Sequence, residues 1–200
     1  MAGSVRQIIE VPCTVEALER SEALSQLAPE ALTALGAESI DGDALGVEAA
    51  ARVDAAIEAC LAAYDPRGVY KLFNPAICTL PPEYSEPAIK LVGTMMMFHG
   101  QSVYERLRRA AHCALMAVTI GPDNPAALPA DADELDRALA DACARALVES
   151  AADHVNAAIV AAAMEEGLYT DDRLSPAWAT SRWTRARSSC STRNPRSAWV

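Results

Sequence analysis

The stretch CALMAVTI, residues 113–120, decides the fold class of this chain. It is a continuous apolar run that ends at the turn signal Gly121-Pro122. An apolar run of this length, bounded by turn residues, is typical of a buried strand. At least one strand is therefore expected in the core.

Two helix-like stretches lie on either side of this strand in the sequence. Val47–Tyr64 has apolar residues at helical spacing and is followed by the stop signal Asp65-Pro66. Residues 131–167 are rich in alanine, and Gly167 is a plausible stop. The second stretch predicts either two helices or one long bent helix.

Shorter elements complete the pattern. The predicted strands are residues 5–12, 69–73, 76–80 and 88–92, and the predicted short helices lie within 14–37, with a break near Pro29, and at 101–111. In the last helix, Val103 and Leu107 share one face, while Arg106 and Arg109 lie on the other. The order is not a regular alternation of strand and helix, so we expect an α+β fold with a mixed or antiparallel sheet and flanking helices.

The composition limits the classes of function. The chain has 200 residues, of which 52% are hydrophobic and 22% charged, with a net charge of -10. These values predict a globular protein and argue against a nucleic-acid binder, which needs a basic surface. We find neither a signal peptide nor an apolar run long enough for a membrane span, so we expect a cytoplasmic protein without a membrane partner. None of the six cysteines forms a CxxC motif, so we expect neither a metal site nor a redox motif, and the lack of a secretory signal predicts reduced thiols.

The C-terminal residues 177–200 differ from the rest of the chain. All three tryptophans and five arginines lie there, and no acidic residue follows Asp172. We interpret this anomalous basic tail as the product of a frameshift near codon 176, because reading one base earlier can restore a glycine after Pro176. The alternative is a genuine basic tail that binds an acidic partner.

The usual catalytic signatures, among them GxSxG, HExxH and the phosphate-binding glycine loops, are absent. The candidate binding residues are instead Glu149 and Asp153, which are four residues apart and share a helix face, and Arg173 beyond the helix. Taken alone, the two acids are typical of a solvated face and the arginine of a surface position.

The same residues, taken together, resemble a known family. The segments that carry the resemblance are DACARALVESAAD at 141–153, Glu166-Gly167-Leu168, Arg173-Leu174-Ser175-Pro176, YKLFNP at 70–75 and the strand ending at Gly121. In order and spacing they resemble the activation domain of vitamin B12-dependent methionine synthase, and most closely its short stand-alone versions. The resemblance covers residues 46–176, which leaves 1–45 as an N-terminal extension and 177–200 as the tail.

The resemblance implies binding of S-adenosylmethionine and a role in the reductive methylation of cobalamin carried by a partner. Glu149 or Asp153 would face the amino or sulfonium end of the ligand, and Arg173 would bind its carboxylate. Ser175 and Pro176 belong to the turn that would line the adenosine. Ala177-Trp178 follows where the family has Gly-Tyr, which is a departure from the pattern. The implied partners are a corrinoid-binding protein or methionine synthase, and an electron donor.

Three functional hypotheses follow. The first is a reactivation module that binds S-adenosylmethionine and whose only enzymatic role is the reactivation part of a corrinoid-dependent methyltransferase. The second is a truncated or ligand-less interaction domain without activity of its own, which the altered turn favours. The third, a self-sufficient methyltransferase, is disfavoured because no general base or metal site is recognisable.

Overall fold

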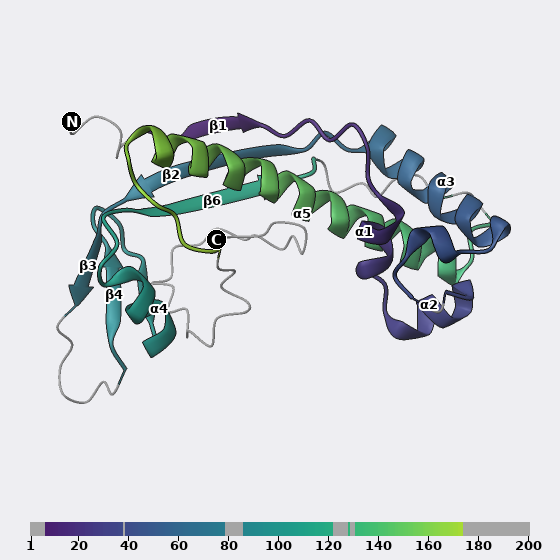
Figure 1. Ribbon diagram of the computed structural model, residues 1–200, viewed down its shortest axis with the longest axis horizontal. Coiled ribbons are helices and arrows are strands. Elements are labelled where there is room, and N and C mark those ends of the chain that lie inside the picture. Colours follow the sequence, from purple (N-terminus) through teal and green to yellow (C-terminus); the bar gives the residue numbers. More distant parts are fainter. Residues whose placement is uncertain (1–6, 38, 79–85, 122–127, 129–130, 174–200) are drawn as a thin grey trace. The chain divides into compact units, whose positions relative to one another are not determined.

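The computed structural model describes residues 7–37, 39–78, 86–121, 128 and 131–173. In chain order the elements are β1 (Ile9–Pro12), α1 (Arg20–Ser25), α2 (Pro29–Leu35), the 3₁₀ turn η2 (Gly42–Ala44), α3 (Val47–Ala63), β2 (Arg67–Phe73), β3 (Pro75–Cys78), β4 (Ala88–Leu91), β5 (Met97–His99), α4 (Gln101–Leu107), β6 (Cys113–Thr119) and α5 (Glu134–Glu165). This arrangement is an α+β fold (Figure 1). Within the described ranges, no helix is both long and apolar enough to cross a membrane.

The strands form two small antiparallel sheets. One sheet has the order β1-β2-β6, and the directions of its arrows alternate in Figure 1. The other has the order β3-β4-β5, with Ile77 opposite Ile89 and Ile89 opposite Phe98. The fold class predicted from the sequence is confirmed at this level, with antiparallel sheets and flanking helices.

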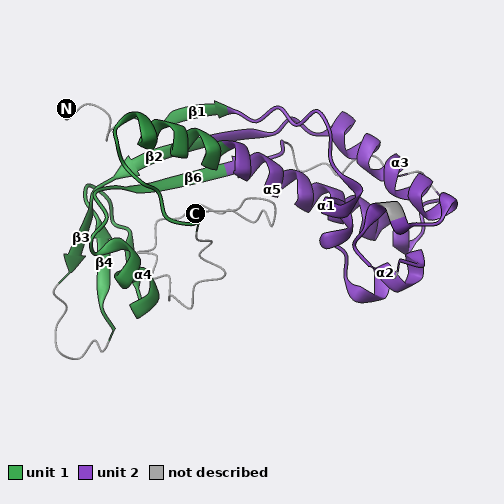
Figure 2. Cartoon of the chain, in the orientation of Figure 1, with its two compact units in different colours: residues 1–11, 69–117, 155–200 green, residues 12–68, 118–154 purple. Residues whose placement is uncertain are grey.

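The chain divides into two compact units, coloured separately in Figure 2. Unit 1 comprises residues 1–11, 69–117 and 155–200, and unit 2 comprises residues 12–68 and 118–154. Helix α5 contributes residues 134–154 to unit 2 and residues 155–165 to unit 1. Neither unit is therefore a continuous piece of sequence.

Unit 2 is a helical unit in which α1 packs against α3. Arg20 of α1 donates two hydrogen bonds to the carboxylate of Asp54 on α3, through Nε and Nη2, both at 2.7 Å. The hydrogen bonds from Arg20 lower the pKa of the Asp54 carboxyl below its usual range. Gly42 lies so close to Arg20 that an added Cβ would clash with the Cβ of that arginine. Glycine at this position therefore permits the close approach of η2 to α1.

The start of α5 is fixed within unit 2 by a reciprocal pair of hydrogen bonds. The backbone N–H of Asp136 donates to Asp133 Oδ1 at 2.8 Å, and the backbone N–H of Asp133 donates to Asp136 Oδ2 at 3.1 Å. This arrangement is a capping box built from two aspartates. Arg52 of α3 donates hydrogen bonds to both carboxylates, at 2.8 and 2.6 Å, and so ties α3 to the first turn of α5.

Helix α5 fills much of the core of unit 2 and is buried over most of its circumference there. Leu139, Cys143 and Leu147 recur at intervals of four residues and are each at most 1% exposed. Intermediate positions of the same helix carry buried alanines, at 142, 144, 146, 151 and 152. Small side chains allow neighbouring backbone to approach this helix closely, which explains its alanine-rich sequence.

In unit 1, β4 is the central strand of its sheet, and α4 packs against it. Ile89 and Leu91 of β4 are fully buried, whereas the exposed Lys90 points to the opposite face. The alternation is the period of two expected for a strand with one covered face.

Most predicted elements are confirmed, with one of the two alternatives for the alanine-rich stretch, and the differences concern α4, β6 and β5. The long alanine-rich stretch is one helix, α5, which ends before Gly167 with its φ of 71°. Helix α4 ends at Leu107, four residues earlier than expected, because the N–H of Ala110 turns back to the carbonyl of Leu107 at 3.1 Å as the chain bends toward β6. Strand β6 is only partly buried, since Met116 and Val118 are buried, whereas its first three residues and Ala117 are half-buried and Thr119 is exposed.

Strand β5 was not predicted. Its three residues, Met97–His99, lie in a methionine-rich run without alternation, and their pairing with β4 supplies the strand conformation. Met95 of the same run is 77% exposed.

Candidate functional site

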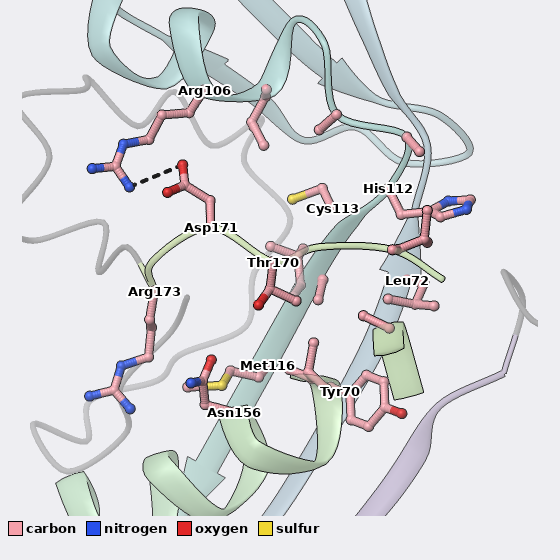
Figure 3. A pocket seen from close by; sticks show the side chains of 18 of the residues that line it. Tyr70, Leu72, Arg106, His112, Cys113, Met116, Asn156, Thr170, Asp171 and Arg173 are labelled. Carbon is pink, nitrogen blue, oxygen red and sulfur yellow. Dashed lines mark hydrogen bonds and ion pairs between the residues drawn. The ribbon is translucent and has the colours of Figure 1, made fainter. Parts of the chain in front are cut away.

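Unit 1 contains a cavity of about 580 Å³. Its walls come from β2, β6, α4, the last turns of α5 and the segment after α5 (Figure 3). A volume of this size falls within the range of pockets for small ligands, roughly 300–1,000 Å³. The cavity is therefore the candidate binding site.

Most of the cavity wall is apolar. Tyr70 and Leu72 come from β2, Met116 from β6, Val103 from α4 and Ile159 from α5. Alternate residues of β2 point to the same face of the sheet, which explains why Tyr70 and Leu72 both reach the cavity. Such a wall can hold a flat or apolar group.

Polar side chains lie around this apolar wall. Figure 3 shows Arg106, Asn156, Asp171 and Arg173 among them. Arg106 of α4 forms an ion pair with Asp171, with 3.4 Å between Nη1 and Oδ2. A wall with a few convergent polar groups suits a ligand that has one apolar and one charged end.

His112 also lines the cavity, but one nitrogen of its ring is within hydrogen-bond distance of another side chain. Its Nδ1 lies 3.0 Å from Oδ1 of Asn74, the residue between β2 and β3. In Figure 3 the ring points away from the centre of the cavity. His112 therefore has a structural interaction and is a poor candidate for a catalytic base.

Residues 168–173, which we call the strap, run from the end of α5 along the cavity. Gly167 adopts a φ of 71°, and the N–H of Leu168 donates to the carbonyl of Ala163 at 2.9 Å. This 6→1 hydrogen bond is the mark of a Schellman motif, which needs glycine at the left-handed position. The motif ends the helix and directs the strap toward the cavity.

The cavity also contains a thiol, that of Cys113. Burial raises the pKa of Cys113 to about 11, so the thiol stays protonated at neutral pH. Among the described residues, no group of three or more histidine, cysteine, aspartate or glutamate side chains could hold a metal ion. A protonated thiol is a weak nucleophile, so Cys113 is not expected to act as one at neutral pH.

The predicted site residues fall in three places. Arg173 is half-buried and lines the cavity of unit 1. Glu149 and Asp153 are exposed on the part of α5 that belongs to unit 2, and neither is among the lining residues. Ser175 and Pro176, like the tail 177–200, lie outside the described residues.

Several lining residues were not singled out from the sequence. Asn156 is three residues beyond Asp153 on α5, so the helical spacing that selected Glu149 and Asp153 extends to it. Arg106 was assigned to the face of its helix opposite Val103 and Leu107, yet all three line the cavity. The cavity therefore contacts more of the circumference of α4 than the single apolar face that the sequence pattern defines.

The remaining buried thiols belong to unit 2. Burial, with a smaller contribution from Cys60, raises the pKa of Cys143 to about 12, and burial also raises the pKa of Cys13. Cys13, Cys60 and Cys143 are each at most 1% exposed and belong to the core of unit 2. Cys78 and Cys113 are only partly buried, and Cys190 lies outside the described residues.

Comparison of the chain with family models, with curated proteins and with solved structures finds no match.

Proposed function

We propose that this chain is a module that binds S-adenosylmethionine and supports the reductive methylation of cobalamin in a corrinoid-dependent methyltransferase such as methionine synthase. The observation that carries the proposal is the position of Arg173, which lines a largely apolar cavity and directly precedes Leu174-Ser175-Pro176. A guanidinium beside an apolar wall suits a ligand with both a carboxylate and a flat ring.

The chemistry of the ligand suits the cavity in two respects. Its adenine ring is a flat group that Tyr70, Leu72 and Met116 can cover. Its amino-acid end carries a carboxylate that the planar fork of Arg173 can bind through two parallel hydrogen bonds. The volume of about 580 Å³ leaves room for both ends.

Other parts of the proposed site rest on the family resemblance. The resemblance alone assigns Glu149 or Asp153 to the amino or sulfonium end and Ser175 and Pro176 to the adenosine, and the cavity lining includes neither of the two acids. Cobalamin, carried by the partner, supplies the chemistry of electron and methyl transfer, while this chain binds and orients the methyl donor. The proposal implies a cytoplasmic protein that meets a corrinoid-binding protein and an electron donor.

A second candidate is a ligand-less interaction domain. Two observations favour it: Ala177-Trp178 follows Pro176 where the family has Gly-Tyr, and the cavity lining does not include Glu149 or Asp153. The two candidates differ in one measurable property, the uptake of S-adenosylmethionine by the isolated chain.

Calorimetric titration of the full chain with S-adenosylmethionine tests the proposal. We expect saturable binding that Arg173→Ala weakens by about 1.5–3 kcal/mol, the scale of a lost hydrogen bond to a charged group. Arg137→Ala is the matched control, because Arg137 is an exposed arginine of α5 that does not line the cavity. Absence of binding by a chain with a native circular dichroism spectrum would refute the proposal and favour the interaction domain.

A further inference from the structure

The strap is held at its two ends by different interactions. At the first end, the Schellman motif fixes Leu168 to the last turn of α5 through a hydrogen bond of 2.9 Å to Ala163. At the other end, Asp171 forms its ion pair with Arg106 of α4. The first anchor is local to α5, whereas the second joins residues 65 positions apart in the sequence.

The carboxylate of Asp171 is oriented for this pair. The backbone N–H of Asp172 donates to Asp171 Oδ1 at 2.9 Å, which leaves Oδ2 directed at Arg106 (Figure 3). The ion pair is nevertheless loose, with 3.4 Å between its atoms and side chains that are 36% and 69% exposed. Exposed pairs of this kind shift an equilibrium by at most about fivefold, so this anchor can open readily.

We infer that the ion pair between Arg106 and Asp171 is a latch that holds the strap against the cavity and thereby positions Arg173. Arg173 is two residues beyond Asp171, so its reach into the cavity depends on where Asp171 is held. Arg106 therefore acts as a positioning residue for Arg173. The effect on a ligand rests on the proposed function, whereas the latch itself does not.

Arg108, the C-cap of α4, provides a matched control for Arg106. Arg108, which follows α4 directly, forms an ion pair with Glu105 at 2.8 Å and is not among the lining residues. Both arginines are partly exposed to the same degree, 36% for each side chain. Loss of Arg108 therefore removes a similar charge and a similar ion pair without touching the strap.

Cys113 provides a reporter of strap position that needs no ligand. Its thiol lines the cavity together with Thr170 and Asp171 (Figure 3). Movement of the strap would admit water and reagent and would bring the raised pKa of the Cys113 thiol back toward its usual value, which increases the reactive thiolate. Cys78 of β3 is also partly buried but does not line the cavity, so it serves as an internal reference.

The experiment is alkylation of the full chain with iodoacetamide, with the rates at Cys113 and Cys78 followed by peptide mass spectrometry. We expect Arg106→Ala and Asp171→Asn each to raise the Cys113 rate two- to fivefold while the Cys78 rate stays constant. The exchanged pair, Arg106→Asp with Asp171→Arg, should restore the wild-type rate, and Arg108→Ala should leave both rates unchanged. Affinity for S-adenosylmethionine should fall by the same factor in the two single variants.

Three results would overturn the latch: single variants with an unchanged Cys113 rate, an exchanged pair that fails to restore it, or equal acceleration at Cys113 and Cys78. The last result would show that the ion pair supports the stability of unit 1 as a whole. The proposed function fails separately, if the wild-type chain takes up no S-adenosylmethionine while the alkylation rates follow the latch.

Discussion

The two units of this chain differ in the burial of their cysteines and in the hydrogen bonding of their arginines. In unit 2, Cys13, Cys60 and Cys143 are each at most 1% exposed, whereas the two described cysteines of unit 1, Cys78 and Cys113, are only partly buried. The difference extends to the charged groups. Arg20 and Arg52 of unit 2 bind carboxylates through several hydrogen bonds, while Arg106 of unit 1 reaches Asp171 through a single contact of 3.4 Å.

This contrast indicates a division of roles. A closely packed region has little space for a ligand, but it can hold a long helix in place. A region with a partly covered cavity and loose polar contacts opens at a lower free energy, as ligand-binding regions generally do. We therefore place the proposed ligand site in unit 1, where the cavity lies.

The largest expected effect on the free energy of unfolding comes from a pair of leucine truncations, one in each unit. Leu147 of unit 2 is fully buried, so Leu147→Ala should reduce the free energy of unfolding by about 2–5 kcal/mol. Leu115 of unit 1 lines the cavity and is only partly buried, so Leu115→Ala should cost about 1–2 kcal/mol. Urea denaturation followed by circular dichroism measures both values. Equal losses would contradict the difference in packing.

A smaller effect is expected at a glycine of unit 2. Gly42→Ala introduces a Cβ that clashes with Arg20, so it should reduce the free energy of unfolding by about 1–3 kcal/mol. Gly46→Ala is the control, because nothing lies within 4 Å of its added Cβ. Gly46 is the N-cap of α3, where alanine is less favourable, so a loss below about 1 kcal/mol is expected. Equal midpoints of urea denaturation for the two variants would show that η2 does not pack closely against α1.

The smallest expected effect is on the loss of stability at acidic pH. The hydrogen bonds from Arg20 lower the pKa of Asp54, so the ionised carboxylate stabilises the folded state fully above the unfolded aspartate pKa of about 3.9. As the pH falls below this value, the unfolded chain binds the proton first, and the contribution is lost as the pH passes through the lower pKa of the folded state. Asp54→Asn should therefore flatten the decline in stability below about pH 4.

Urea denaturation at a series of pH values between about 2.5 and 7 measures this decline. Arg20→Ala is the control and should flatten the acid limb in the same way, because it removes the donor of both hydrogen bonds. An unchanged acid limb in both variants would show that the pair contributes nothing to the pH dependence.

Elements with a strong local signal could be predicted from the sequence. The helical spacing of Val47–Ala63 and the left-handed Gly167 gave two helix boundaries to within a residue or two. Strand β5 could not be predicted, because its conformation depends on pairing with β4 rather than on its own residues. The length of α4 depends likewise on the bend that brings the chain to β6.

The candidate site could be predicted only in part, for a similar reason. Arg173 was selected through the family resemblance and not through its position alone, and it lines the cavity. Arg106 and Asp171 were not selected, because residues 65 positions apart give no sign in the sequence that they meet. A cavity is assembled from several elements, and helical or strand spacing describes only one element at a time.

The division of α5 between the two units has a consequence for synthesis on the ribosome. The last segment of unit 2 ends at residue 154, whereas the segment that completes the cavity of unit 1 ends at residue 173. At about 5–20 residues per second, translation of the intervening stretch takes roughly 1–4 seconds. All residues of unit 2 are therefore synthesised before the last residues that line the cavity of unit 1. The first turns of α5 can pack within unit 2 while those lining residues are still being translated.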